Sequence, residues 1–131
     1  MEFDHERLDV YQASLKFFAI AIKLISTLPP GHSHLSDQLK RAFVSITLNI
    51  AEGAGVFSRA EKARFYRMSR RSATECAAVV DICKQLELGK SELRAECRQT
   101  LLSIVSMLVK LIKSMNGKSV GQGQGQGHPL R

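Results

Sequence analysis

The sequence contains no apolar run that approaches the roughly twenty residues needed to cross a membrane. Its opening stretch, MEFDHERLDVYQ, is acidic and interrupted by charges, which argues against a signal peptide. Cysteine is also scarce. The three thiols cannot all pair, and Cys76 and Cys83 lie seven residues apart in one predicted helix, beyond disulfide reach. We therefore expect a soluble cytoplasmic protein with reduced thiols.

The residue sets that catalysis and metal binding require are missing as well. The ExxH spacing of di-iron bundles occurs once, at Glu2 and His5, without a second copy or a glutamate-rich core stripe. His32 and His34 share a loop that offers no third and fourth metal ligand. The GAGVFS segment at 53–58 lacks the preceding strand and the lysine of a phosphate loop. We expect no enzymatic activity, no metal site and no cofactor.

Apolar residues recur at helical spacing along four segments, and helix-ending residues separate them. The first segment ends at LPPG, residues 28–31, because proline removes a backbone donor and clashes with the preceding turn. Ser33 can cap the second segment. Gly53 and Gly55 offer that helix a left-handed exit, so we expect it to end near Glu52.

The second half of the sequence predicts two more helices. Ser58 and Glu61 have the spacing of a capping box, and Ser91 can cap the fourth helix. Four helices with short loops predict an all-α fold, an antiparallel up-down-up-down four-helix bundle. The last fourteen residues alternate Gly and Gln with almost no apolar content, which predicts disorder. The expected organisation is an N-terminal extension at 1–7, the bundle at 8–117 and a Gly/Gln-rich tail at 118–131.

The first and fourth helices are apolar over more of their circumference than a monomeric bundle needs. Beyond the main stripes they carry further apolar side chains, which we expect other subunits to cover in a homo-oligomer. The alternative is that a small, loosely packed bundle uses some of these positions internally. The additional residues are Tyr11, Leu15, Phe18, Ile22 and Ile25 in the first helix, and Leu102, Val105, Val109 and Ile112 in the fourth.

A polar stripe bracketed by apolar residues runs along the second helix just before its end. Because buried polar groups need partners, the stripe indicates a hydrogen-bond network with the third helix. A ligand-binding or catalytic site is the alternative. The expected network comprises Arg41, Ser45, Asn49, Glu52, Ser72 and Glu75.

Positive charge is concentrated at the start of the third helix. Residues 1–117 hold 17 Lys and Arg against 12 Asp and Glu, an excess of five positive charges. Residues 59–71 alone hold six against one, so this segment carries the whole excess of positive charge. Such a patch suits phosphate backbones, although an ordinary solvated basic face is the alternative. The expected nucleic-acid-binding residues are Arg59, Lys62, Arg64, Arg67, Arg70 and Arg71.

Two of these arginines have no acidic residue within helical reach. Neither Arg67 nor Arg70 has an Asp or Glu three or four residues away, whereas Arg71 can pair with Glu75. We therefore expect Arg67 and Arg70 to be the main ligand contacts. Arg71 is expected to contribute to stability.

The segment from Gln38 to Glu75 resembles the central signature of the 23S rRNA intervening-sequence protein family. In that family the second helix ends in N-I-A-E-G and the third opens with S, E and F. The residues that match are Arg41, Ala42, Ser45, Ile46, Asn49, Ile50, Ala51, Glu52, Gly53, Gly55, Ser58, Glu61, Phe65, Ser72 and Glu75. The opening LDVYQASLKF is similar to the family's first helix, so the likeness covers residues 8–115.

This resemblance implies a ring-like homo-oligomer, a pentameric barrel, and no catalytic residues. The family is similar to the accessory protein of diversity-generating retroelements, which binds RNA and a reverse transcriptase. The combined expectation is a non-enzymatic oligomer that binds nucleic acid, most simply structured RNA, through the third helix. The alternative is an adaptor that docks an acidic partner such as a reverse transcriptase.

Overall fold

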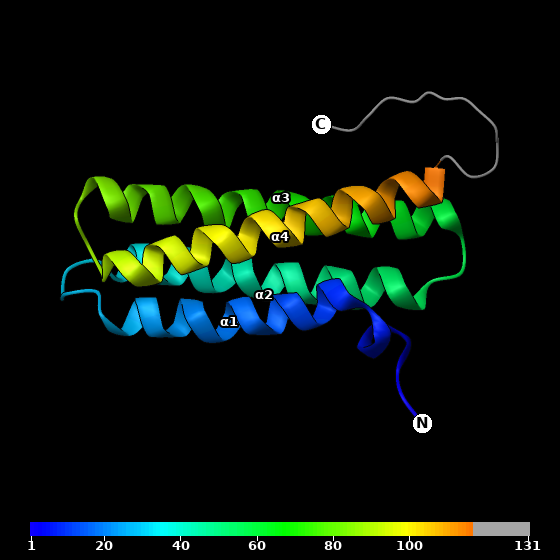
Figure 1. The fold of residues 1–131 in the computed structure, drawn as a ribbon, viewed down its shortest axis with the longest axis horizontal. Helices are drawn as coiled ribbons and strands as arrows, with labels where there is room; N and C mark the ends of the chain where they lie inside the picture. Colours follow the sequence, from blue (N-terminus) through cyan, green and yellow to red (C-terminus); the bar gives the residue numbers. More distant parts are fainter. Residues whose placement is uncertain (117–131) are drawn as a thin grey trace.

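Four long helices and one short helical turn make up residues 1–116, the part of the chain that the computed structural model describes. Each helix runs antiparallel to the next, as in the predicted four-helix bundle (Figure 1). The Gly/Gln-rich tail predicted at 118–131 lies outside the described residues. The elements are the 3-10 turn η1 (Asp4–Arg7) and the helices α1 (Asp9–Ser26), α2 (Ser33–Gly55), α3 (Arg59–Gln85) and α4 (Ser91–Asn116).

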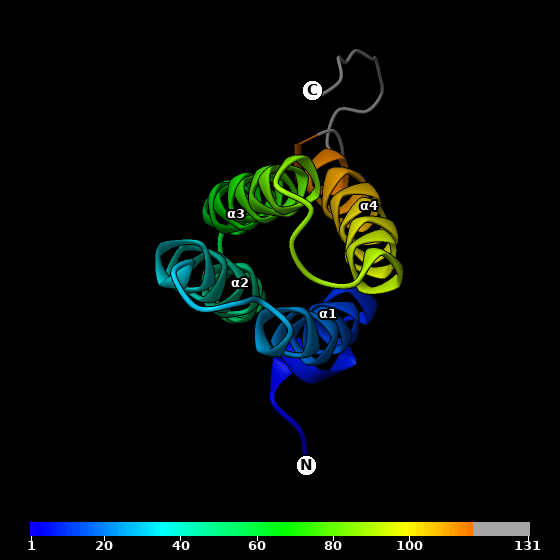
Figure 2. The same ribbon diagram turned by 90° about the vertical axis from the view of Figure 1, so that its left-hand side faces the viewer.

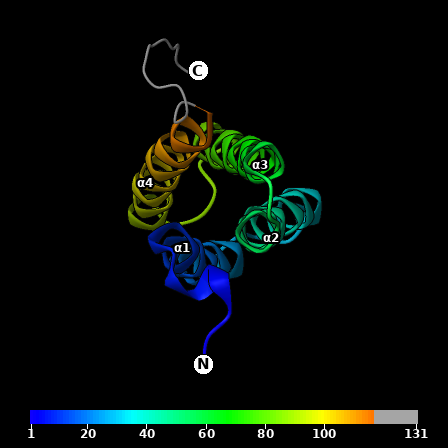
Figure 3. The ribbon, with the colours of Figure 1, turned by 90° about the vertical axis from the view of Figure 1, so that its right-hand side faces the viewer.

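Viewed along the bundle, the helices form a ring in the order α1, α2, α3, α4, and α4 closes against α1 (Figures 2 and 3). Each helix turns apolar residues inward, and Phe17, Ile46, Cys76 and Ile104 are completely buried. The packing is uneven, because α2 lies most extensively against α3 and least extensively against α1. The hairpin of α2 and α3 is therefore the best-packed part of the molecule.

The end of α2 differs from the prediction made for its glycines. The helix continues to Gly55, and neither Gly53 nor Gly55 has a positive φ, so the predicted left-handed exit near Glu52 is wrong. Gly53 serves a different purpose: a Cβ at this position would lie 2.7 Å from Cε1 of the buried Tyr66 ring. The glycine lets α2 approach α3 closely.

We expect Gly53→Ala to lower the free energy of unfolding by about 1–3 kcal/mol, because the Tyr66 ring is buried and would have to move. Gly55→Ala is the matched control, since a Cβ there meets nothing within 4 Å. Alanine at 55 should leave stability unchanged or raise it slightly through helix propensity. Urea denaturation of both variants measures the difference, and equal midpoints would contradict the packing role of Gly53.

Exposed apolar side chains gather on α1 and α2, and less on α4 than expected. In α4 only Leu102 of the expected set is well exposed, and Val105 packs against the core. Ile112 is completely buried, so the prediction that Ile112 lies at a subunit interface is wrong. The α1 set keeps three exposed members, and α2 adds two that the prediction missed. We name the following five residues the α1/α2 apolar surface: Leu15, Phe18, Ile22, Val44 and Leu48.

The two helices hold this surface together through contacts just beneath it. The Phe18 ring packs edge-on against Phe43, with centroids 5.0 Å apart. The Thr47 hydroxyl donates a hydrogen bond of 3.1 Å to the Ser14 hydroxyl. Val44 and Leu48 each follow one of these α2 contact residues in the chain, which turns them toward the exposed side of α2. The α1/α2 apolar surface therefore consists of exposed residues on two helices that pack against each other.

Candidate nucleic-acid interface

The start of α3 is held against the end of α2 by polar contacts. The Ser58 hydroxyl accepts a hydrogen bond of 2.9 Å from the Glu61 backbone N–H, as the capping-box spacing predicted. Glu61 does not complete the box, because its carboxylate pairs with Arg64 at 3.3 Å. The Lys62 ammonium donates to the carbonyls of Gly53 and Ala54, at 3.2 and 3.0 Å. Lys62 thus caps α2 and is half-buried, which separates it from the other cations of the segment.

Three arginines of α3 are exposed, and their side chains make no hydrogen bond or ion pair within residues 1–116: Arg59, Arg67 and Arg71. We refer to these three as the α3 arginine face. The predicted ion pair between Arg71 and Glu75 does not form, and the Glu75 carboxylate instead accepts a hydrogen bond from Gln38 of α2. Arg71 therefore joins Arg67 as an available cation.

The two remaining arginines of the basic segment are partly engaged. Arg64 pairs with Glu61, lies 4.6 Å over the Phe65 ring and approaches the Met68 sulfur at 3.7 Å. Arg70 is half-buried, and its Nη1 atom is buried without a hydrogen-bond partner among the described residues. Arg70 is thus less accessible than Arg67, and its predicted role as a main ligand contact stays a prediction.

The polar stripe of α2 forms a smaller network than expected. The Ser72 hydroxyl donates to the Ser45 hydroxyl at 2.8 Å, and the Asn49 amide donates to both the hydroxyl and the carbonyl of Ser45. Arg41 and Glu52 are exposed and make no side-chain hydrogen bond or ion pair within residues 1–116. The prediction that they belong to the hydrogen-bond network was therefore wrong. Arg41 and Glu52 both lie on the outward side of α2.

A buried serine strengthens the same junction. Ser69 is completely buried, and its hydroxyl donates a hydrogen bond of 2.9 Å to the carbonyl of Ile46 in α2. Because every polar member of the network contacts another residue of α2 or α3, no group points to a ligand. The network is a structural joint of the α2–α3 hairpin.

The most exposed residue beside the arginines was not among the predicted site residues. Phe57 lies in the three-residue connection between α2 and α3 and is 97% exposed. A helical apolar period could not identify it, because it belongs to no helix. The available signal was an aromatic residue in a short loop directly before a run of cations.

The three cysteines do not form a second site. Cys76, Cys83 and Cys97 are free thiols, all completely buried between α3 and α4. Burial raises the pKa of Cys76 and of Cys97 to about 12, so neither is a thiolate nucleophile near neutral pH. No cluster of three potential metal-ligating side chains exists in the described part of the chain. The thiols act as small core residues.

Raised thiol pKa values predict a loss of stability in alkali. Below pH 9.0, the ordinary value, both states keep the thiols protonated, whereas between pH 9.0 and about 12 only the unfolded chain ionises at Cys76 and Cys97. The free energy of unfolding should then fall by about 1.4 kcal/mol per pH unit for each thiol. Urea titrations across this range measure the slope. A Cys76→Ala, Cys97→Ala variant should show a shallower decline, and an equal decline would assign the effect elsewhere.

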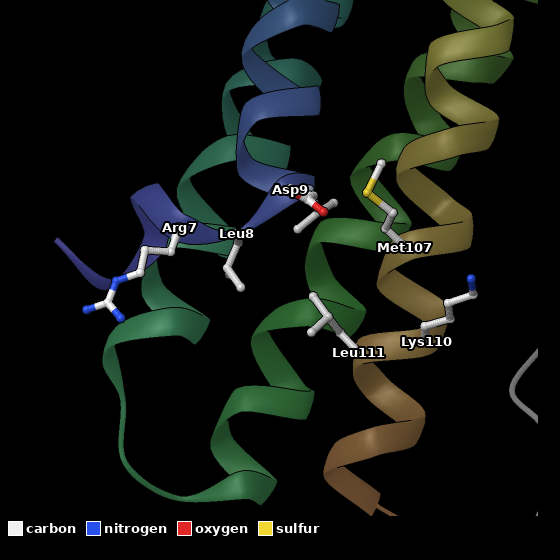
Figure 4. Close-up of a pocket in the computed structure, with 7 residues that line it drawn as sticks. Arg7, Leu8, Asp9, Met107, Lys110 and Leu111 are labelled. Carbon is white, nitrogen blue, oxygen red and sulfur yellow. The ribbon is translucent and has the colours of Figure 1, made fainter. Parts of the chain in front are cut away.

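A hollow of about 400 Å³ lies between the start of α1 and the C-terminal half of α4 (Figure 4). Leu8, Met107 and Leu111 give it an apolar lining. Two of its charged neighbours do not converge: the Arg7 guanidinium and the Lys110 ammonium point away from the centre in Figure 4, and Arg7 pairs with Glu2 at 3.5 Å. Asp9 is the remaining charged lining residue, and one carboxylate does not make the convergent set of polar groups of a ligand site.

The bundle and its α2–α3 hairpin can now be compared with known proteins. The model of the 23S rRNA-intervening sequence protein family matches residues 6–110. Among solved structures, the chain is similar to a protein of unknown function from the S23 ribosomal protein family of Bacteroides thetaiotaomicron, at 24% sequence identity and a TM-score of 0.73. That alignment covers 79% of this chain and 98% of the other. No protein of curated function matches.

Within residues 1–116, no helix has the length and the apolar content that a membrane crossing requires. The similar structure supports the four-helix fold, and the family match covers α1, α2, α3 and most of α4, including the hairpin that carries the signature. The chain therefore belongs to the 23S rRNA-intervening sequence protein family.

Proposed function

We propose that this protein is a non-enzymatic RNA-binding bundle with a role related to ribosomal RNA, and that it contacts RNA through the α3 arginine face. One observation carries the proposal: the segment that holds the excess positive charge of residues 1–117 also presents three exposed arginines whose side chains have no partner among the described residues. Guanidinium groups suit phosphate oxygens, because they remain charged and can donate two parallel hydrogen bonds. The family description supports RNA as the partner.

The geometry of α3 favours an extended anionic ligand over a compact one. Arg59 and Arg71 are twelve residues apart on a continuous helix, and at 1.5 Å per residue they span about 18 Å. That length accommodates successive phosphates of a nucleic-acid strand. A rigid helix also fixes the spacing of the cations before the ligand arrives, which lowers the entropy cost of binding.

We further propose that subunits assemble through the α1/α2 apolar surface. Five exposed apolar side chains on two adjacent helices form a surface of the kind that subunit interfaces cover. The α3 arginine face lies on another helix, so assembly leaves it available. A ring, which the family resemblance implies to be a pentamer, would present one arginine face per subunit and increase avidity for a long RNA.

The direct test is the salt dependence of binding to a structured RNA. Affinity should fall log-linearly as salt rises, with a slope that reports the number of neutralised phosphates, and unrelated RNA sequences should behave alike. Fluorescence anisotropy with labelled RNA hairpins measures this dependence. Indifference to RNA, combined with capture of one acidic protein such as a reverse transcriptase, would reject the proposal in favour of an adaptor.

A further inference from the structure

Phe57 is the most exposed large apolar side chain next to the α3 arginine face. It is 97% exposed, so its ring makes almost no contact with the rest of residues 1–116. A phenylalanine stabilises a fold only through the apolar area that it buries. Here it buries almost none, and the bundle gains no stability from its presence.

The loop that carries Phe57 is nevertheless well anchored. Val56 and Ser58 on either side of it have extended backbone angles, with φ of −88° and −77°. Ser58 caps α3, Lys62 caps α2 across the loop, and Gly53 packs against the Tyr66 ring. With both ends fixed, the loop holds the backbone of Phe57 in place at the tip of the best-packed hairpin.

The surroundings of Phe57 favour an anionic partner that also offers a flat apolar face. Arg59 is two residues away, exposed and without a partner in the described chain. As a cation in the first turn of α3 it opposes the helix dipole, so it does not serve helix stability either. A nucleotide combines the two required features, because its phosphate suits Arg59 and its base can stack on an aromatic ring.

We infer that Phe57 is a stacking platform for an unpaired nucleobase of the bound RNA, with Arg59 holding the adjacent phosphate. This inference rests on the proposed function and narrows its ligand to RNA with single-stranded or looped nucleotides, because bases inside a duplex do not expose a face for stacking. Stacking tolerates any base, so Phe57 adds affinity without sequence preference.

The experiment compares Phe57→Ala with the parent protein on two labelled RNAs, a short single strand and a long, perfectly paired duplex. Loss of one stacked base should lower affinity for the single strand by roughly 5- to 150-fold, while affinity for the duplex changes less than about twofold. The salt slope should be unchanged, since no phosphate contact is lost. Phe57→Tyr should bind as the parent does. Phe57→Leu should bind weakly, because leucine is apolar and of similar bulk but has no aromatic ring on which a base can stack.

Leu86→Ala is the matched control, because Leu86 is also exposed but follows the opposite end of α3. It should leave both affinities unchanged. The inference is overturned if Phe57→Ala keeps the single-strand affinity, if Leu rescues as well as Tyr, or if the variant loses its oligomeric mass, which would place Phe57 in a subunit interface. A parent protein with salt-dependent RNA binding and a silent Phe57→Ala variant would reject the inference alone. A parent that binds neither RNA would reject the proposed function as well.

Discussion

Joint replacement of Arg59, Arg67 and Arg71 by glutamine should weaken RNA binding at 0.1 M salt by roughly a hundredfold or more, because each lost phosphate contact removes its share of counterion release. The magnitude of the log-salt slope should fall by about 0.7–0.9 for each contact removed. Helicity and thermal stability should remain as in the parent, since these side chains are exposed and have no partners within residues 1–116. Anisotropy titrations at several salt concentrations and circular dichroism provide the two measurements.

A matched control changes the net charge equally at another place. Lys16, Lys23 and Arg98 are exposed on α1 and α4, and their joint replacement by glutamine should leave most of the affinity and the slope intact. If both triple variants lose affinity to the same extent, RNA responds to overall charge, and the α3 arginine face has no special role.

Lys62 separates structural from ligand-binding cations within the same segment. Its ammonium donates to two carbonyls at the end of α2, so Lys62→Gln should lower the free energy of unfolding by about 1 kcal/mol or more with little change in the salt slope. The opposite result, with unchanged stability and a reduced slope, would return Lys62 to the set of RNA contacts.

Helical period and turn residues predicted most of the fold but not the details of the α2–α3 hairpin. Ser58 caps α3 as predicted, and the proline break separates α1 from α2, because these signals act within a few residues. The predicted Ser33 cap is wrong, since His32 is the N-cap of α2 and makes no side-chain cap hydrogen bond. Gly53 was misinterpreted because a helix-ending glycine and a close-packing glycine have the same sequence signal. Only the neighbouring Tyr66 ring, thirteen residues away in the chain, distinguishes them.

The candidate site was likewise predictable only where neighbours in the sequence determine it. Clustering of the arginines on α3 followed from the sequence, whereas their accessibility depended on contacts with other helices. Gln38 donates a hydrogen bond to the Glu75 carboxylate while Arg71 makes no ion pair within residues 1–116, and Arg70 is half-buried. Pairing rules within one helix could not predict either result, because α2 and the bundle packing determine both.

Introduction of a charge into the α1/α2 apolar surface should dissociate the oligomer without unfolding the bundle. Leu48 is the most exposed member at 60%, so Leu48→Glu places its carboxylate in water in a monomer but in an apolar contact in the assembly. Light scattering of the parent should give a mass several-fold above 14.5 kDa, and the variant should approach that monomer value.

Leu102→Glu determines which face forms the contact. Leu102 is 53% exposed, close to the exposure of Leu48, but it lies on α4 and outside the α1/α2 apolar surface. The substitution should leave the oligomeric mass unchanged, because a lone exposed leucine contributes little to association. Dissociation by Leu102→Glu and not by Leu48→Glu would place the interface on α4, and a monomeric parent at micromolar concentration would reject assembly altogether.

If the Leu48→Glu monomer keeps its helicity, its RNA affinity can be compared directly with that of the parent. A large loss with the α3 arginine face intact would then measure the avidity that the ring provides.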